Sequence, residues 1–158
     1  MVVDGPNWLP SAGSFFVGPV VGREEAQRIA RRVRGARFAD SFLSWYRPDE
    51  RRVRIPAALA LRASGFMNGD RWGDVGLSPQ HVLAVVNFGG ASAGAFLAVA
   101  RHLRAQTRAA LGIELRPEVK LLGDALVPDW AAYVAEHGHR PGSGEPEWAL
   151  DMGRARRG

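Results

Sequence analysis

Hydrophobic residues recur along the chain at the spacing of amphipathic helices. One such pattern predicts a helix over residues 23–34, with apolar side chains on a single face at Ala26, Ile29, Ala30 and Val33. A longer pattern predicts a second helix from about Ser92, a plausible N-cap, to Leu111, followed by a glycine suited to close it. Residues 56–64 are apolar almost all round, which predicts a largely buried helix that starts at a proline.

Stretches rich in β-branched and aromatic residues predict short strands between these helices. They cover residues 14–21, 51–55, 72–75 and 82–87. Residues 113–122 alternate apolar and polar side chains, and Pro117 restricts that strand to a sheet edge or a bulge. Because strands and helices are mixed and joined by short connections, we expect an α+β fold in which a small mixed or antiparallel sheet packs against two or three helices.

The length of 158 residues suits one domain, for which we expect the boundaries 1–123. Residues 36–50 predict a loop or short helix with aromatic anchors. Residues 124–158 form an extension, with a short helix over 129–135 and then a tail from Gly138 that is rich in glycine, proline and charge. We expect this tail to be disordered because it has little to bury.

The composition excludes several classes of protein. There is no cysteine, so disulfides, thiolate metal sites and cysteine nucleophiles are ruled out. No stretch approaches the roughly 20 continuous apolar residues of a membrane span. The first residues lack the basic and apolar regions of a secretory signal, so we expect a cytoplasmic location and no membrane partner.

The formal net charge is +5, and Lys120 is the only lysine among 21 basic residues, so arginine dominates. Arginine favours planar anions such as phosphate and carboxylate. The arginines are scattered and form no basic stripe interleaved with aromatic side chains, which disfavours a nucleic-acid partner. An anionic small-molecule substrate fits the composition equally well.

The segment Ser11–Val21 holds the first candidate for chemistry. Gly13 has no side chain to obstruct an approach to the Ser14 hydroxyl, and an apolar strand follows. Ser14 is therefore interpreted either as a hydroxyl presented from a rigid strand end or as a serine in an ordinary turn.

Ser14, His81 and Glu118 contain the groups of a hydrolase triad, but Ser14 lacks the Gly-x-Ser-x-Gly nucleophile elbow. A serine that donates a proton, paired with a carboxylate, stays open. Glu118 suits such a pairing because the alternation places it on a polar face between Arg116 and Lys120.

Other polar groups carry weaker predictions. Gly89-Gly90 before the long helix could cradle a phosphate, but the spacing fits no known phosphate loop and a plain strand-to-helix turn is favoured. His137 and His139 lie in the predicted tail without an acidic partner, so no metal is expected there. His102 is expected at the surface of the long helix.

Four segments in this order resemble the C-terminal domain of the UDP-N-acetylenolpyruvoylglucosamine reductase (MurB) family. They are Ser11–Phe16 with Pro19, Val53–Ala58, Leu77–Asn87, and Gly112–Val119 with Gly123. Their order and domain-scale spacing make residues 2–123 similar to this domain, and the resemblance implies its α+β fold.

The resemblance implies a flavin-dependent reduction in peptidoglycan precursor synthesis. In this family NADPH reduces a bound FAD, which passes hydride to the enolpyruvyl group of UDP-N-acetylglucosamine enolpyruvate. By the resemblance, Ser14 protonates the neighbouring carbon and Glu118 helps to stabilise the enol-type intermediate. Gly13, Gly18 and His81 are assigned to substrate binding on the same basis.

The chain also departs from the family pattern. The family often has asparagine where Gly18 stands, and tryptophan and glutamate where Leu59 and Arg62 stand. The family's FAD-binding domain belongs upstream of the serine motif, so we expect this chain not to bind FAD alone and to need a separate or missing FAD-binding domain. The alternative is a stand-alone, non-redox module that binds UDP-sugars.

Overall fold

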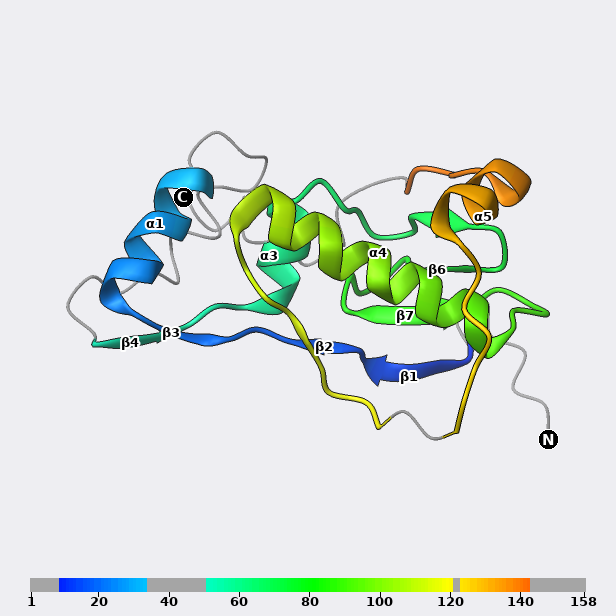
Figure 1. Ribbon diagram of the computed structural model, residues 1–158, viewed down its shortest axis with the longest axis horizontal. Coiled ribbons are helices and arrows are strands. Elements are labelled where there is room, and N and C mark those ends of the chain that lie inside the picture. The colour runs from blue at the N-terminus through cyan, green and yellow to red at the C-terminus, as the bar shows by residue number, and fades with distance from the viewer. Residues whose placement is uncertain (1–8, 34–50, 121–122, 143–158) are drawn as a thin grey trace, which may run out of the picture.

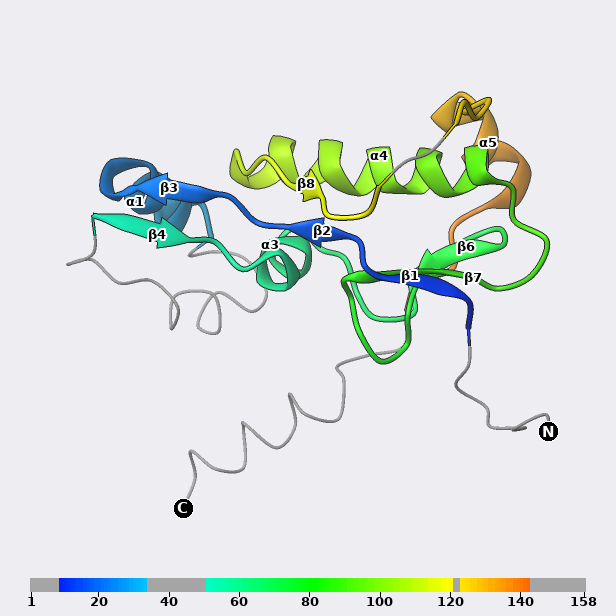
Figure 2. The ribbon, with the colours of Figure 1, turned by 90° about the horizontal axis from the view of Figure 1, so that it is seen from below.

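The computed structural model describes residues 9–33, 51–120 and 123–142. Three consecutive strands, β1 (Ser11–Ser14), β2 (Phe16–Val17) and β3 (Val20–Gly22), run along one side of the elongated molecule. In Figure 1 the helices lie on the other side of this run, and Figure 2, seen from below, shows α3 and α4 to either side of it. One side of β1–β3 is therefore covered by helices, and the other carries no described element along most of its length.

Antiparallel pairs build three small sheets. The largest has the order β1-β7-β6-β5, where β7 is Ala84–Asn87, β6 is Val75–Leu77 and β5 is Arg71–Trp72. Strand β2 pairs with β8 (Arg116–Pro117), and β3 pairs with β4 (Arg52–Arg54). The predicted α+β class with antiparallel sheets is confirmed.

The helices begin and end close to where the sequence pattern predicts. Helix α1 (Arg23–Val33) buries the four apolar side chains of its predicted face, and α3 (Ala57–Ala63) is largely buried. Helix α4 (Ala93–Leu111) starts at Ser92, whose hydroxyl accepts a backbone N–H, and ends at Gly112 with φ 71°. Within the described residues no helix is long and apolar enough to cross a membrane.

One continuous core lies between the helices and the strands. Among the side chains that it buries are Phe15, Ile29, Leu61, Leu77, Val99 and Leu103. The Phe15 ring packs against Phe16 at a centroid distance of 4.8 Å and against Phe96 of α4 at 5.6 Å. Each fully buried side chain of this size stabilises the fold by about 1.5–3 kcal/mol, so the segment that contains Phe15 is firmly held.

Two of the predicted strands differ in the structure. The strand expected near 72–75 is a hairpin, because Gly73 and Asp74 form a two-residue turn between β5 and β6, with Gly73 at φ 61°. Within the described residues 113–120 of the strand expected over 113–122, only Arg116–Pro117 forms a strand, at an edge as Pro117 requires. The loop or short helix expected at 36–50 lies outside the described residues.

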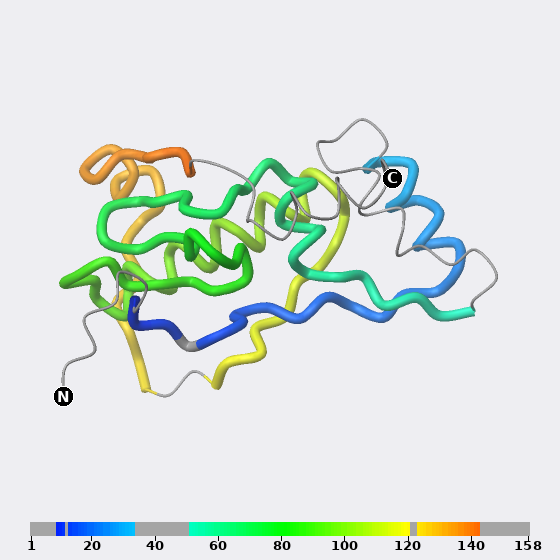
Figure 3. The backbone as a smooth tube through the Cα atoms, turned by 180° about the vertical axis from the view of Figure 1, so that it is seen from behind, coloured from blue at the N-terminus to red at the C-terminus, as the bar shows by residue number. Residues whose placement is uncertain are grey.

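The extension folds back onto the domain. Its helix α5 (Trp130–His137) starts at Asp129, as predicted, and continues two residues further than expected. Residues 138–142 then run beside β5 (Figure 3), where Arg140 and Arg71 exchange two backbone hydrogen bonds of 2.7 and 2.9 Å. The prediction of disorder from Gly138 is wrong for 138–142, because backbone pairing and a 2.8 Å bond from the Gly142 N–H to Asp70 hold them.

Aromatic and histidine rings fill the contact between the extension and the domain. The His102 ring of α4 stacks on Trp130 at 4.1 Å, and Trp72 stacks on His139 at 4.8 Å. The buried Tyr133 hydroxyl donates to the Trp72 carbonyl oxygen over 2.8 Å. The expectation that His102 is a surface residue is wrong: burial, and then the nearby His139, lower the pKa of His102 to about 4.

Acidification is expected to loosen this contact. The pKa of His102 in the folded protein lies below its ordinary value of 6.5, so protonation favours the unfolded chain. The stabilisation by the neutral ring is complete above about pH 6.5 and is lost as the pH falls from there toward about 4. We expect a loss on the order of 1 kcal/mol, since the ring is only half-buried and water screens part of its charge.

Thermal unfolding followed by tryptophan fluorescence tests this prediction. We expect Tm to fall by about 2–4 °C as the pH is lowered from about 6.5 toward about 4. The matched control is His102→Phe, which keeps a planar ring in the stack but cannot titrate. An equally steep dependence of Tm on pH in this variant would show that groups other than His102 control the acid response.

Candidate functional site

Ser14 ends β1 at an irregularity in its pairing with β7. Ser11 pairs with Val86 and Ser14 with Ala84, so β1 contains one residue more than its partner over this stretch. The bulge includes Gly13, whose φ of 76° is a conformation that other residues seldom adopt. Bulges change the direction of a side chain, and Ser14 is exposed. The structure thus supports a hydroxyl presented from a strand end.

Phe15 connects Ser14 to Glu118. The Phe15 N–H donates to the Leu83 carbonyl oxygen, and the Phe15 carbonyl oxygen accepts from the Glu118 N–H, each over 2.9 Å. Phe15 itself is buried, whereas the side chains of Ser14 and Glu118 are exposed. Because the two residues flank one buried anchor, the structure brings the backbones of Ser14 and Glu118 close together although the sequence separates them widely.

His81 lies on the β7 side of the same anchor. Its Nδ1 atom accepts the Leu83 N–H over 3.2 Å, and its carbonyl oxygen accepts the N–H of Ala84, the register partner of Ser14. No hydrogen bond joins the side chains of Ser14, His81 and Glu118, all of which are described. These three residues are therefore neighbours but do not form an assembled hydrolase triad.

Gly18 is buried, and its environment explains why a glycine stands there. A Cβ atom at this position would collide with the Ile55 carbonyl oxygen and lie 3.2 Å from the Ala57 nitrogen. The Ile55 N–H also donates to the Pro19 carbonyl oxygen over 2.9 Å. The backbone of the segment before α3 therefore packs directly against Gly18. A role of Gly18 in substrate binding stays a prediction.

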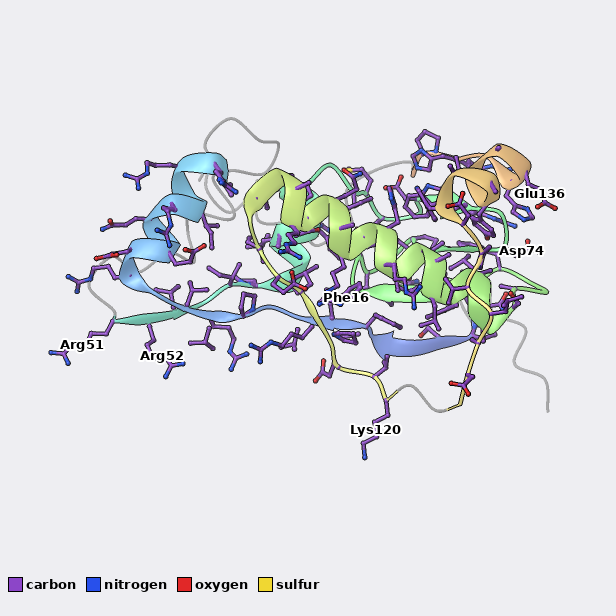
Figure 4. All side chains as sticks on the ribbon, in the orientation of Figure 1. Phe16, Arg51, Arg52, Asp74, Lys120 and Glu136 are labelled. Atoms are coloured by element: carbon purple, nitrogen blue, oxygen red, sulfur yellow. The ribbon has the colours of Figure 1, made fainter. Side chains whose placement is uncertain are left out.

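The face around Glu118 is cationic. Arg116 and Lys120 are both exposed, as are Arg52 and Arg54 of β4. Figure 4 shows Arg52 and Lys120 pointing away from the helices on this side of the molecule. Guanidinium and ammonium groups bind phosphate and carboxylate, so the face is suited to an anionic ligand.

A buried polar link behind the site was not predicted. Arg62 of α3 is 3% exposed, and its Nη2 atom donates to the Asn68 side-chain oxygen over 2.9 Å. The Asn68 amide donates in turn to the Pro79 carbonyl oxygen over 3.2 Å, in the loop that leads to His81. An arginine within an otherwise apolar helix was the only indication of this link in the sequence.

The glycine pair before α4 forms a turn. The Asn87 side-chain oxygen accepts the N–H of Gly89 over 2.8 Å and that of Ala91 over 3.2 Å. These donors are already engaged, which favours the strand-to-helix turn over a phosphate cradle. Among the residues that the structure describes, no group of three histidine, aspartate or glutamate side chains could hold a metal ion.

Comparison with known proteins gives consistent matches over this domain. Residues 5–122 match the model of the family described as UDP-N-acetylenolpyruvoylglucosamine reductase, C-terminal domain. Proteins of that name are similar to the chain: the one from Mycolicibacterium gilvum is 40% identical over 78% of this chain, the one from Thermobifida fusca 36% over 73%, and the one from Bacteroides fragilis 32% over 74%. The matched part covers 33% of each relative, so the chain spans about a third of their length.

Proposed function

Because the chain belongs to the UDP-N-acetylenolpyruvoylglucosamine reductase family, we propose that it is the substrate-binding and proton-donating part of such a reductase. The substrate is UDP-N-acetylglucosamine enolpyruvate, and the product is UDP-N-acetylmuramate for peptidoglycan synthesis. One observation carries the proposal: Ser14 and Glu118 flank the buried Phe15, and both side chains are exposed on a cationic face.

In this proposal the chain's own residues handle the substrate and the proton. The Ser14 hydroxyl gives its proton to one carbon of the enolpyruvyl double bond and is then reprotonated by water at the exposed strand end. Glu118 stabilises the enol-type intermediate, and His81 with the nearby cations binds the substrate. A group that stabilises developing charge lowers the activation barrier most when it is already in position before the reaction. The two backbone hydrogen bonds of Phe15 hold the backbone near Ser14 and at Glu118 in place.

FAD reduced by NADPH supplies the hydride in this proposal. The exposed side chains of Ser14 and Glu118 fit the substrate side of such a site, and the matched residues are those of the family's C-terminal domain. We therefore propose that an FAD-binding domain beyond the described residues, or on another chain, completes the site.

A second candidate is a UDP-sugar-binding module without redox chemistry. The closed packing at Gly18 favours it, because no side chain can reach the ligand from a position where the family often has asparagine. This module would bind the same class of ligand on the same face, so binding alone does not separate the two candidates.

Reconstitution separates them. The chain is combined with the part of the Thermobifida fusca relative that lies outside the match, together with FAD, and NADPH oxidation is followed with UDP-N-acetylglucosamine enolpyruvate present. We expect substrate-dependent oxidation only when both parts are present. Binding of the substrate without turnover, in this and in other such pairings, would instead support the binding module.

A further inference from the structure

A cavity lies where the docked extension meets the rest of the domain. Its volume is about 360 Å³, and it lies between the β5–β6 hairpin and the segment that follows α5. The hairpin contributes Arg71, Gly73 and Asp74 to its lining, and the extension contributes His137, Gly138, His139 and Arg140. Figure 4 places Asp74 and Glu136 together at this end of the molecule.

Two arginines face each other in this cavity. Arg71 and Arg140 are directly paired in an antiparallel bridge, which places their side chains on the same side of the backbone. Like charges at directly opposite positions destabilise strand pairing. The pairing is nevertheless formed, by two short backbone hydrogen bonds. An anion held between the two guanidinium groups would remove this repulsion.

The Arg71 guanidinium is fixed in place before any ligand binds. Its Nε atom donates to the Gly73 carbonyl oxygen over 2.6 Å, and its Nη2 atom lies 3.0 Å from the Asp74 carboxylate. Its Cζ atom lies over the Phe88 ring, 4.4 Å from the ring centre. A guanidinium held in this way loses little freedom when it binds an oxyanion bidentately. Arg140, by contrast, is exposed, and no side chain in the described parts of the chain pairs with it.

The acidic groups around the cavity already have basic side chains beside them. Asp74 is paired with Arg71, Glu136 lies 3.7 Å from His137, and Asp70 lies 3.4 Å from His139. The two imidazoles add N–H groups that can donate to an oxyanion. Among the side chains that line the cavity, two guanidinium groups, Arg71 and Arg140, stand against the single carboxylate of Asp74, and the imidazoles add further possible donors.

We propose that this cavity binds a phosphate-type oxyanion between Arg71 and Arg140. One guanidinium comes from the domain and the other from the extension, so the anion also holds the extension in its docked position. The extension residues of this site lie beyond residues 5–122, which match the family model. The proposal therefore does not depend on the proposed reductase function.

Inorganic phosphate titrated into the full chain tests this, with sodium chloride adjusted to constant ionic strength. Nitrogen-15 NMR is expected to show saturable shifts of the Gly73, Gly138 and Arg140 amide signals. Arg140→Gln is expected to weaken phosphate binding at least about tenfold, since it removes one of two charge-assisted contacts. The matched control is Arg101→Gln, the same change at an exposed position on α4, and it is expected to bind phosphate like the wild type.

UDP, as a second probe, distinguishes the sources of the oxyanion. Shifts at these amides with phosphate but not with UDP assign a free phosphate, and shifts with UDP assign the phosphate of a nucleotide; either supports the site. The proposal is overturned if the NMR shifts are spread over arginines elsewhere in the chain. It is also overturned if Arg140→Gln and Arg101→Gln bind phosphate with equal affinity. Because the NMR map uses the wild type, the test stands even if Arg140→Gln releases the extension.

Discussion

Replacing Ser14 with alanine is expected to lower the turnover of the reconstituted reductase by about 10²–10⁴-fold, the range that a positioned proton donor contributes. The proton moves only in the transition state, so kcat is expected to fall while the affinity for UDP-N-acetylglucosamine enolpyruvate changes little. Ser14 is exposed and its backbone pairs with Ala84, so the loss of the hydroxyl leaves the strand intact.

The matched control for this variant is Ser64→Ala. Ser64 lies at the end of α3, where its hydroxyl donates to the Ala60 carbonyl oxygen, and the chemical change is the same. Turnover is expected to stay within a few-fold of the wild type in this control. If Ser14→Ala also retained turnover, Ser14 would be a serine in an ordinary turn, and the proton would have to come from water or another group.

Gly18→Ala is expected to destabilise the protein by at least about 3 kcal/mol, the upper range for forcing extra volume into a packed site. The added methyl group meets the Ile55 carbonyl group and the Ala57 nitrogen, which are backbone atoms and cannot rotate away as a side chain would. Gly18→Asn is expected to cost as much or more. Introducing the asparagine that is frequent in the family would therefore unfold this protein before it restored a substrate contact.

Chemical denaturation measures this effect, and Gly22→Ala is its control. Gly22 lies four residues further along, in β3, and a Cβ atom there would have no neighbour within 4 Å. The control is expected to be neutral or slightly stabilising, since alanine restricts the unfolded chain more than glycine does. Equal stability of the two variants would mean that the segment before α3 can move away from Gly18.

The sequence predicts the elements whose determinants are local. Helix α4 is an example, because its capping serine, its apolar face and its closing glycine all lie within or beside the helix. The hairpin at β5 and β6 was taken for one strand, since only pairing reveals that Gly73 and Asp74 separate two. The pattern of local residues carries no information about which strand will lie beside which.

Contacts between distant segments explain the remaining differences. Nothing near His102 in the sequence indicates that Trp130 will stack on it, so a helix edge was interpreted as surface. The sequence associates Ser14 and Glu118 by their chemistry and by the family resemblance, but their closeness rests on the bonds of Phe15, which spacing alone does not predict. The packing at Gly18 is likewise a property of the folded backbone.

The pairing of Arg140 with Arg71 also closes one border of the four-stranded sheet, where β5 is the last strand. Without residues 138–142, β5 would expose unpaired backbone N–H and C=O groups to solvent, beside the aromatic surface that α5 covers. Such a border is a template for strand addition by another molecule. A shortened form that ends at the family match would therefore tend to self-associate, and a soluble version of this domain should retain the chain through Gly142.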